Sequence, residues 1–297
     1  MDAIAPDVAC IDLRERGQPE RMAGYFIGAP RPALIESGAS RSVPHWLEFL
    51  EKRDIPRDEI AYLIVTHVHL DHAGGAGTLL KHLPHARLVV HPSGARHLVD
   101  PTRLVQSARA VFGQQLEAYW GLPEPVDSAR IEAPDENARL DLGDGHKLRF
   151  LPAYGHARHQ YMILDEGTGA LWAGDELGIR YPRLRCHPDY VLPTTAPNQF
   201  DPEAMIRSVE LVRSLGPEAV LPSHFGRLRM DLEQLAERLR QQIHAFSTAG
   251  RSAAADGLPP TAAAVEARLR THIRADLEDY EVEWSDEVEA LLDLDLR

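Results

Sequence analysis

Four side chains that can bind metal ions lie within six consecutive positions of the sequence: His67, His69, Asp71 and His72. The apolar run 62–65 precedes them and predicts a buried strand that ends at this group. Residues two apart in an extended segment point the same way, so His67 and His69 are placed to bind one ion. Asp71 and His72 fall where the chain enters a helix, and they can face a second ion. Imidazole and carboxylate ligands suit zinc, and also iron or manganese.

One such group supplies too few ligands for two ions, and the chain offers three more candidates, His156, Asp175 and His224. Each follows an apolar run and lies within two residues of a glycine. If these runs are strands of a layered sheet, their ends meet at one edge, and the side chains converge with the first group. Asp175 could then bridge both ions. Among the other histidines, His159 could orient a ligand.

Short apolar runs between Gly, Pro and charged residues predict strands, and longer segments with apolar residues every three or four positions predict helices. The expected strands cover residues 8–13, 25–28, 33–36, 62–66, 87–91, 147–153, 161–164, 170–173 and 219–222, the first three antiparallel. The expected helices cover 42–52, 79–83 and 102–120, with another that begins at Asp201-Pro202, a capping pair. Residues 124–146 are expected to form a polar, turn-rich connection.

Helical spacing continues after residue 229, and no strand pattern is found there. We therefore expect an α/β layered catalytic domain over residues 1–229 and a C-terminal helical subdomain over 230–297. Residues 247–260 are rich in Ser, Ala, Gly and Pro and are interpreted as a linker. The acidic segment from Asp276 to the end is interpreted as a solvated helix face or a frayed terminus.

The composition limits the partners of the protein. With 32 basic and 45 acidic residues the formal net charge is −13, which argues against nucleic acid or an anionic membrane surface as a partner. A small-molecule substrate is expected instead. The two cysteines fit a reducing compartment, and the N-terminal residues resemble no signal peptide, so we expect a cytoplasmic protein. No apolar run is long enough to span a membrane.

The order and spacing of the seven candidate ligands resemble the metallo-β-lactamase superfamily over about residues 7–229. The motifs are Thr66-His67-x-His69-x-Asp71-His72, Gly155-His156, Gly174-Asp175 and Ser223-His224-x-Gly226. The resemblance is greatest to the branches that include glyoxalase II, acyl-homoserine lactonases and the quinolone-signal response thioesterase. It implies an αββα sandwich with a C-terminal helical extension. It also implies a first metal on His67, His69 and His156, a second on Asp71, His72 and His224, and Asp175 as the bridge.

Two departures from family patterns are informative. Secreted β-lactamases of this superfamily usually carry cysteine in the second site, where this chain has Asp175, and this argues against antibiotic hydrolysis. The early strand ends Ile35-Glu36-Ser37-Gly38, where many relatives have Asp-Thr-Gly. We expect Glu36 to have a structural role.

The main functional hypothesis is hydrolysis of an ester, thioester or lactone by two divalent ions, most simply zinc, that hold a bridging hydroxide. Asp71 and Asp175 would take part in catalysis as ionised ligands. Arg158 and Arg180 are candidates to bind an anionic group of the substrate. Tyr190 is a candidate to line the mouth of the site.

Two other functions stay open at this stage. One is a mononuclear iron persulfide dioxygenase, although that function would be marked by a degraded second site. The other is a metal-binding regulatory protein that acts by protein contact. The C-terminal helices could cover the site or form a homodimer interface.

Overall fold

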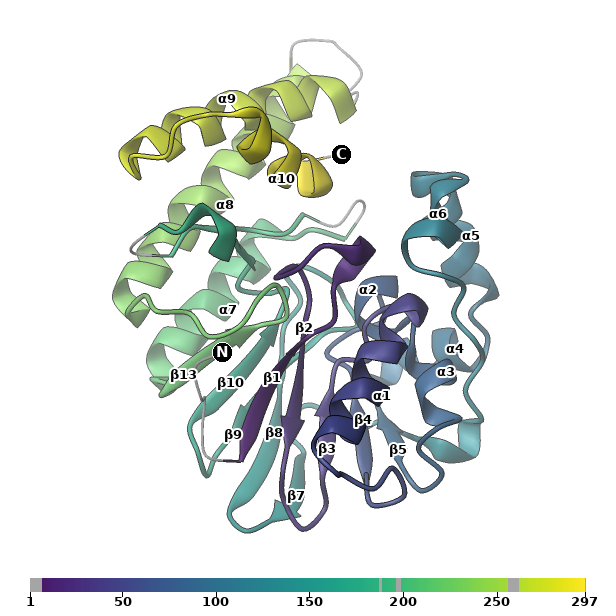
Figure 1. Cartoon of the computed structure of the whole chain (residues 1–297). Coiled ribbons are helices and arrows are strands. Elements are labelled where there is room, and N and C mark those ends of the chain that lie inside the picture. Colours follow the sequence, from purple (N-terminus) through teal and green to yellow (C-terminus); the bar gives the residue numbers. More distant parts are fainter. Residues whose placement is uncertain (1–6, 187–188, 196–198, 256–261, 297) are drawn as a thin grey trace.

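Two β-sheets lie between layers of helices in the computed structural model of the chain, which describes residues 7–186, 189–195, 199–255 and 262–296 (Figure 1). The first sheet has the order of the chain: β1 (Val8–Asp12), β2 (Ala23–Ile27), β3 (Ala33–Ile35), β4 (Tyr62–Ile64), β5 (Arg87–Val89) and β6 (Ile131–Glu132). The second has the order β13 (Ala219–Pro222), β10 (Ala170–Gly174), β9 (Tyr161–Asp165), β8 (His146–Pro152) and β7 (Arg139–Gly143). A separate hairpin is formed by β11 (Ile179–Arg180) and β12 (Val191–Leu192).

The helices fall into two sets along the chain. Between the strands of the first sheet lie α1 (Val43–Lys52), α2 (Leu70–Ala73), α3 (Ala76–Leu80), α4 (Pro92–Val99), α5 (Thr102–Phe112) and α6 (Gln115–Tyr119). The second set comprises α7 (Pro202–Leu215), α8 (Leu232–Ala255), α9 (Ala262–Asp279) and α10 (Asp286–Leu296).

The alternation of side chains along each strand separates the core into three apolar layers. In β4, Leu63 packs toward α1 and α3, whereas Ile64 packs between the two sheets. In β9, Ile163 lies between the sheets, whereas Met162 packs with α7 and α8. This arrangement is the expected αββα sandwich.

The topology brings the ends of several strands to one edge. The strands β3, β4, β5 and β6 are parallel neighbours, and so are β10 and β13. The loops after β4, β10 and β13 therefore leave at corresponding strand ends. The loop between β8 and β9 joins them, because β9 runs antiparallel to β10 and starts where β10 ends.

Three sequence-based expectations about secondary structure were wrong. Residues 124–146 contain β6 and β7, which are short and, apart from Leu142, only partly buried or exposed. Residues 102–120 form two helices, since α5 ends at Gly113, which adopts a φ of 58°. The expected linker 247–260 is helical as far as Ala255, the end of α8; residues 256–260 lie outside the described part.

The acidic C-terminal segment is also more structured than expected. Although α10 is rich in acidic residues, Val288, Leu291 and Leu292 are buried in an apolar cluster with α9 and the β11–β12 hairpin. Helix α8 packs with α7 over the second sheet. The apolar cluster formed by α7, α8 and the second sheet extends across residue 229. The domain boundary expected there stays a prediction.

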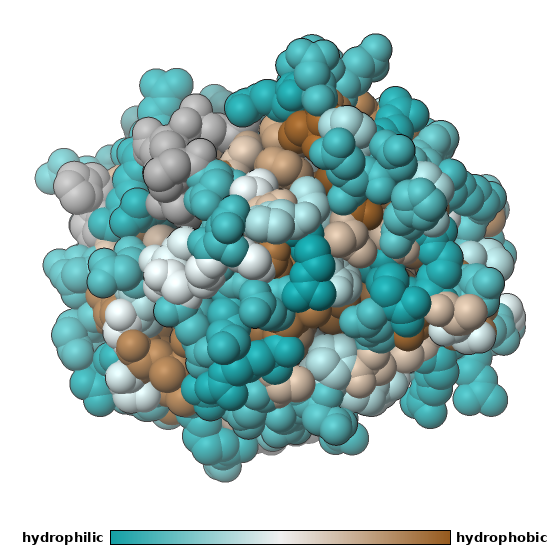
Figure 2. Space-filling view, turned by 90° about the horizontal axis from the view of Figure 1, so that it is seen from below, coloured by the Kyte–Doolittle hydropathy of each residue, from teal (hydrophilic) through white to brown (hydrophobic). Residues whose placement is uncertain are grey.

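Hydrophilic side chains cover most of the face that lies opposite α9 and α10, and apolar surface is limited there (Figure 2). Over the described ranges, no helix combines the length and apolar character needed to cross a membrane.

A buried histidine joins the start of the chain to the second sheet. The Nδ1 of His146 lies 2.6 Å from Asp165 Oδ2, and its Nε2 lies 2.7 Å from Asp7 Oδ2. Burial by itself lowers the pKa of His146, but the hydrogen bonds to both carboxylates outweigh it, and the pKa is raised above its ordinary value of 6.5. Burial raises the pKa of Asp165, but its hydrogen bonds outweigh this effect and lower it. The three groups form an Asp–His–Asp ion triad.

We expect His146→Gln to lower the free energy of unfolding at pH 6 by about 1–3 kcal/mol, the usual range for a lost charged hydrogen bond. Because the folded state holds the proton more tightly, the stabilisation is complete below about pH 6.5 and is lost as pH rises through the raised pKa. Urea unfolding from pH 5.5 to 9 measures this trend. The exposed His85→Gln is the control, and a difference from wild type that is constant over this range would contradict the assignment.

Candidate metal centre

The loop after β4 carries the first group of candidate ligands. His69 precedes α2, and Asp71 and His72 lie in its first turn, so the chain turns sharply between the two pairs. His67 and His72 are fully buried. Gly74 permits this turn, because a Cβ at that position would lie 2.2 Å from the carbonyl oxygen of Leu70.

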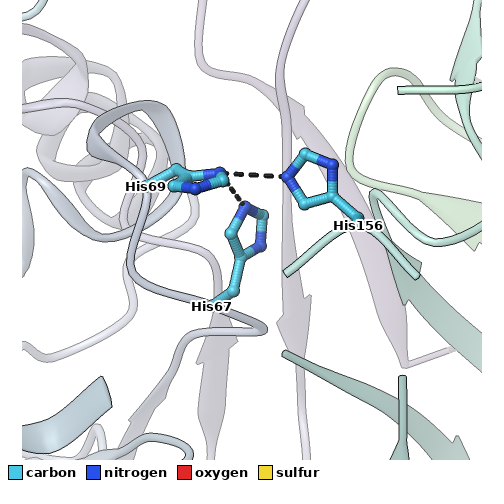
Figure 3. A group of neighbouring side chains, drawn as sticks. All are labelled: His67, His69 and His156. Atoms are coloured by element: carbon cyan, nitrogen blue, oxygen red, sulfur yellow. Dashed lines mark hydrogen bonds between the residues drawn. The ribbon is translucent and has the colours of Figure 1, made fainter. Parts of the chain in front are cut away.

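Three imidazoles meet at the first candidate site (Figure 3). The Nδ1 of His69 lies 2.9 Å from His67 Nε2 and 3.0 Å from His156 Nε2. His67 and His69 come from the loop after β4, and His156 comes from the loop between β8 and β9. The three side chains therefore join the two sheets at one point.

The partners of the remaining ring nitrogens assign the tautomers. The hydroxyl of Thr194 donates to the carbonyl of Asp175, so it accepts from Nδ1 of His156 at 2.7 Å. Thr66 Oγ1 donates to Glu36 and accepts from Nδ1 of His67 at 3.1 Å. His67 and His156 thus direct bare Nε2 lone pairs toward His69. One cation among the three nitrogens satisfies them.

A second group lies beside the first. Asp71 Oδ2 is 3.3 Å from Nε2 of both His72 and His224. Asp175 lies between the groups, with Oδ1 3.2 Å from His72 Nε2 and Oδ2 3.5 Å from His156 Nε2. His72 donates Nδ1–H to Glu36, and His224 donates it to the carbonyl of Arg21 at 2.7 Å. Each Nε2 is therefore free to bind an ion.

The electrostatics of the two groups differ. Burial, with the neighbouring imidazoles, lowers the pKa of His69 to about 3 and that of His156 to about 4. These rings are neutral and can act as ligands. Burial also opposes a charge on His224, but Asp175 and Asp71 outweigh it and raise its pKa to about 9. The two carboxylates thus concentrate negative charge that a divalent ion can neutralise.

The residues present fit a pair of divalent ions. Their donor atoms form three overlapping groups, each within 4.8 Å: His67, His69 and His156; His67, His72 and Asp175; and Asp71, His72 and His224. Among the residues that the structure describes, the buried Nε2 of His72 and Oδ1 of Asp175 have no hydrogen-bond partner. Imidazole and carboxylate donors bind zinc at about 2.0–2.2 Å, so one ion can reach each set.

Sequence reasoning missed how directly Glu36 supports the site. Its Oε1 accepts hydrogen bonds from Thr66 Oγ1 at 2.5 Å, His72 Nδ1 at 3.0 Å and Ser223 Oγ at 2.7 Å. Ser223 precedes His224, so a single carboxylate connects the loops after β3, β4 and β13. The signal available in the sequence was a glutamate directly after the apolar run 33–35; in the structure it is fully buried, with a φ of 63°.

A second buried glutamate holds the loop of His156. Glu176 accepts from the backbone N–H groups of Gly155 and His156 at 2.9 and 3.1 Å, and from Gln160 and Ser208. Burial raises the pKa of Glu176. Gly155 is needed here because a Cβ would lie 2.3 Å from Met205 in α7.

The structure does not bring the predicted substrate residues together. Arg158 is exposed beside His156. Arg180 is largely buried, pairs with Asp189 at 3.0 Å and donates to the carbonyl of Phe225 at 3.2 Å. Tyr190 is 1% exposed and contacts the ring of Tyr181 in a tilted arrangement and that of Tyr280 edge-on. Arg180 and Tyr190 therefore support the β11–β12 hairpin, which leaves Arg158 as the accessible candidate.

His159 lies near the first group without joining it. Its ring centroid is 5.4 Å from that of His69, and its Nδ1 is buried with no hydrogen-bond partner among the described residues. The expectation that it orients a ligand stays a prediction.

We expect Glu36→Gln to weaken metal binding by about 10- to 100-fold, as losses of supporting hydrogen bonds to ligands do. The variant loses the negative charge that these three donors face, and its NH2 group would lie against the backbone N–H of Thr66, which now donates to Oε2 at 3.3 Å. Thr194→Val, which removes the acceptor for His156 Nδ1, should act in the same direction. Competition with a zinc chelator measures the affinity, and the exposed Glu59→Gln is the control. Unchanged affinity in both variants would refute the supporting role of these residues.

Comparison with known proteins finds relatives of the same fold. The metallo-β-lactamase fold-containing protein ST1585 of Sulfurisphaera tokodaii is 28% identical over 229 residues, which cover 76% of this chain and 80% of that protein. Its crystal structure matches with a TM-score of 0.65 at 26% identity, covering 80% of this chain and 86% of that one. The metallo-β-lactamase family protein TTHA1429 of Thermus thermophilus has the same fold, with a TM-score of 0.65, 21% identity, and coverage of 84% and 83%.

A third relative is named as a flavoprotein. A putative diflavin flavoprotein A 1 of Thermosynechococcus vestitus is 25% identical over 227 residues, which cover 73% of this chain but 35% of that protein. The family model of the metallo-β-lactamase superfamily matches residues 25–224, a region that contains all seven candidate ligands. The chain belongs to the metallo-β-lactamase superfamily.

Proposed function

We propose that this chain is a binuclear metal-dependent hydrolase that acts on an ester, thioester or lactone bond of a small substrate. One observation carries the proposal: seven side chains bring their donor atoms into three overlapping groups, with Asp175 near both His72 and His156. The superfamily consists largely of metal-dependent hydrolases. The ligand set favours zinc, although iron or manganese can use the same donors.

Two divalent ions at this site would supply a hydroxide at neutral pH and polarise the substrate carbonyl. The chain's own residues do the positioning. The four Nδ1–H groups of His67, His72, His156 and His224 are held by Thr66, Glu36, Thr194 and the Arg21 carbonyl. Asp71 and Asp175 stay ionised as ligands: although burial opposes it, the neighbouring histidines lower the pKa of both.

The chemistry requires no serine or cysteine nucleophile. Both cysteines have a raised pKa, chiefly because of burial, which makes them weak nucleophiles. Arg158, exposed next to His156, is the residue we propose for contact with an anionic group of the substrate.

An oxidoreductase is the second candidate, and similarity to the putative diflavin flavoprotein favours it. The same imidazoles and carboxylates can bind iron. Metal analysis of the purified protein, together with oxygen uptake in the presence of a reductant, separates the candidates. Two iron ions and oxygen consumption would select the oxidoreductase.

For the hydrolase, we expect turnover of at least one substrate in a panel of thioesters, lactones and phosphodiesters. A chelator should abolish turnover, and added zinc should restore it. Asp175→Ala should abolish it as well, because the variant loses a ligand of both ions, whereas the exposed Asp58→Ala should match wild type. Initial rates give the answer, and near-native rates in Asp175→Ala would rule out the bridging role.

A further inference from the structure

Exposed large apolar side chains gather in one segment of the described chain. They are Val99 at 39% exposed, Val111 at 56%, Phe112 at 37% and Leu122 at 43%. All lie between β5 and β6, where α4, α5 and α6 are found, and α5 has no fully buried residue. A single exposed apolar residue is ordinary, whereas adjacent exposed ones on one helix, such as Val111 and Phe112 of α5, can belong to a binding surface.

The apolar residues of α5 lie on one face of the helix. Their spacing is i, i+1, i+4, i+7 and i+8, the pattern of an amphipathic helix: Leu104, Val105, Ala108, Val111 and Phe112. The first three are partly buried, and the last two are exposed. With a rise of 1.5 Å per residue the stripe runs for about 12 Å, the length of an extended chain of roughly eight to ten carbons.

This stripe adjoins the metal-site loop after β4. Its partly buried residues pack in a cluster with Leu70, which stands between His69 and Asp71 in the sequence. Helices α5 and α6 stand on the same side of the sandwich as α9 and α10, above α2 (Figure 1). An apolar group on α5 would therefore be continuous with the ligand loop.

A second chain of contacts leads from α5 to His224. The ring of Phe112 lies 4.4 Å from that of Trp120, and Trp120 Nε1 donates to Glu15 Oε1 at 3.3 Å. Glu15 pairs with Arg21, whose carbonyl accepts the Nδ1–H of His224. The exposed end of the stripe is thus tied to the other ligand-bearing loop.

We propose that the apolar face of α5 binds an aliphatic acyl chain of the substrate, with the acyl carbonyl at the metal site. This inference rests on the proposed hydrolase function. A second copy of the chain is a less suitable occupant, because a net charge of −13 opposes self-association. Val111 and Phe112 would contact the distal part of the chain, and Leu104 and Val105 the part nearer the metals.

Binding of decanoate and of acetate to the metal-loaded protein tests the proposal without turnover. Calorimetry gives the affinities, and the fluorescence of Trp120 beside Phe112 gives an independent signal. We expect decanoate to bind at least about tenfold more tightly, because apolar area is buried. Phe112→Ser and Val111→Asp should remove that preference, while Gln106→Ser, at an exposed position on the opposite face of α5, should keep it.

Hydrolysis of p-nitrophenyl decanoate and acetate by the same variants separates this inference from the proposed function. Tighter binding of decanoate without hydrolysis of either ester would contradict the hydrolase proposal but would support the acyl-binding site. Equal affinity for the two acids in wild type would overturn the acyl site. A preference for decanoate that both α5 variants retain would overturn it as well. If those variants also convert a dimer to a monomer in sedimentation experiments, the apolar face is a dimer interface instead.

Discussion

Two imidazole lone pairs that point at a third imidazole nitrogen from within 3.0 Å repel it and one another unless a cation lies among the three. His67, His69 and His156 are held in this way, and the tautomers of His67 and His156 leave their Nε2 lone pairs bare. Beside them, the buried Asp175 and the partly buried Asp71 each place a carboxylate oxygen within 3.3 Å of His72 Nε2. Removing such groups from water is costly unless an ion or a proton compensates. The sandwich must supply enough stability to keep them in place.

The hydrogen bonds that hold the ligand loops in place come from residues of both sheets. Glu36 connects the loops after β3, β4 and β13, and Glu176 holds the turn that presents His156. Each of these carboxylates is buried and accepts several hydrogen bonds, so the ligand loops cannot move independently. The β11–β12 hairpin adds a further connection, since it packs against α9 and α10 and leads to Thr194, the acceptor for His156. The C-terminal helices therefore contribute to the site through the hairpin, without supplying a ligand within the described residues.

Much of this arrangement could be predicted from local sequence. The His67–His72 spacing and the apolar run before it are short-range features, and the strand ends before His156, Asp175 and His224 follow from the same pattern. The supporting contacts could not be predicted, because Glu36 meets Ser223 across 187 positions of the chain. Side-chain type alone suggested Tyr190 and Arg180 as substrate contacts. In the structure, tertiary packing largely buries both residues at the β11–β12 hairpin. The short strands β6 and β7 carry too few apolar residues for their pattern to be evident.

The central claim is that the seven donors are organised for two ions. Anomalous diffraction at the absorption edge of the bound metal, on crystals of the purified protein, tests it most directly. We predict two peaks, one bounded by His67, His69 and His156 and the other by Asp71, His72 and His224, with Asp175 between them. A single peak, or none after incubation with zinc, would contradict the account.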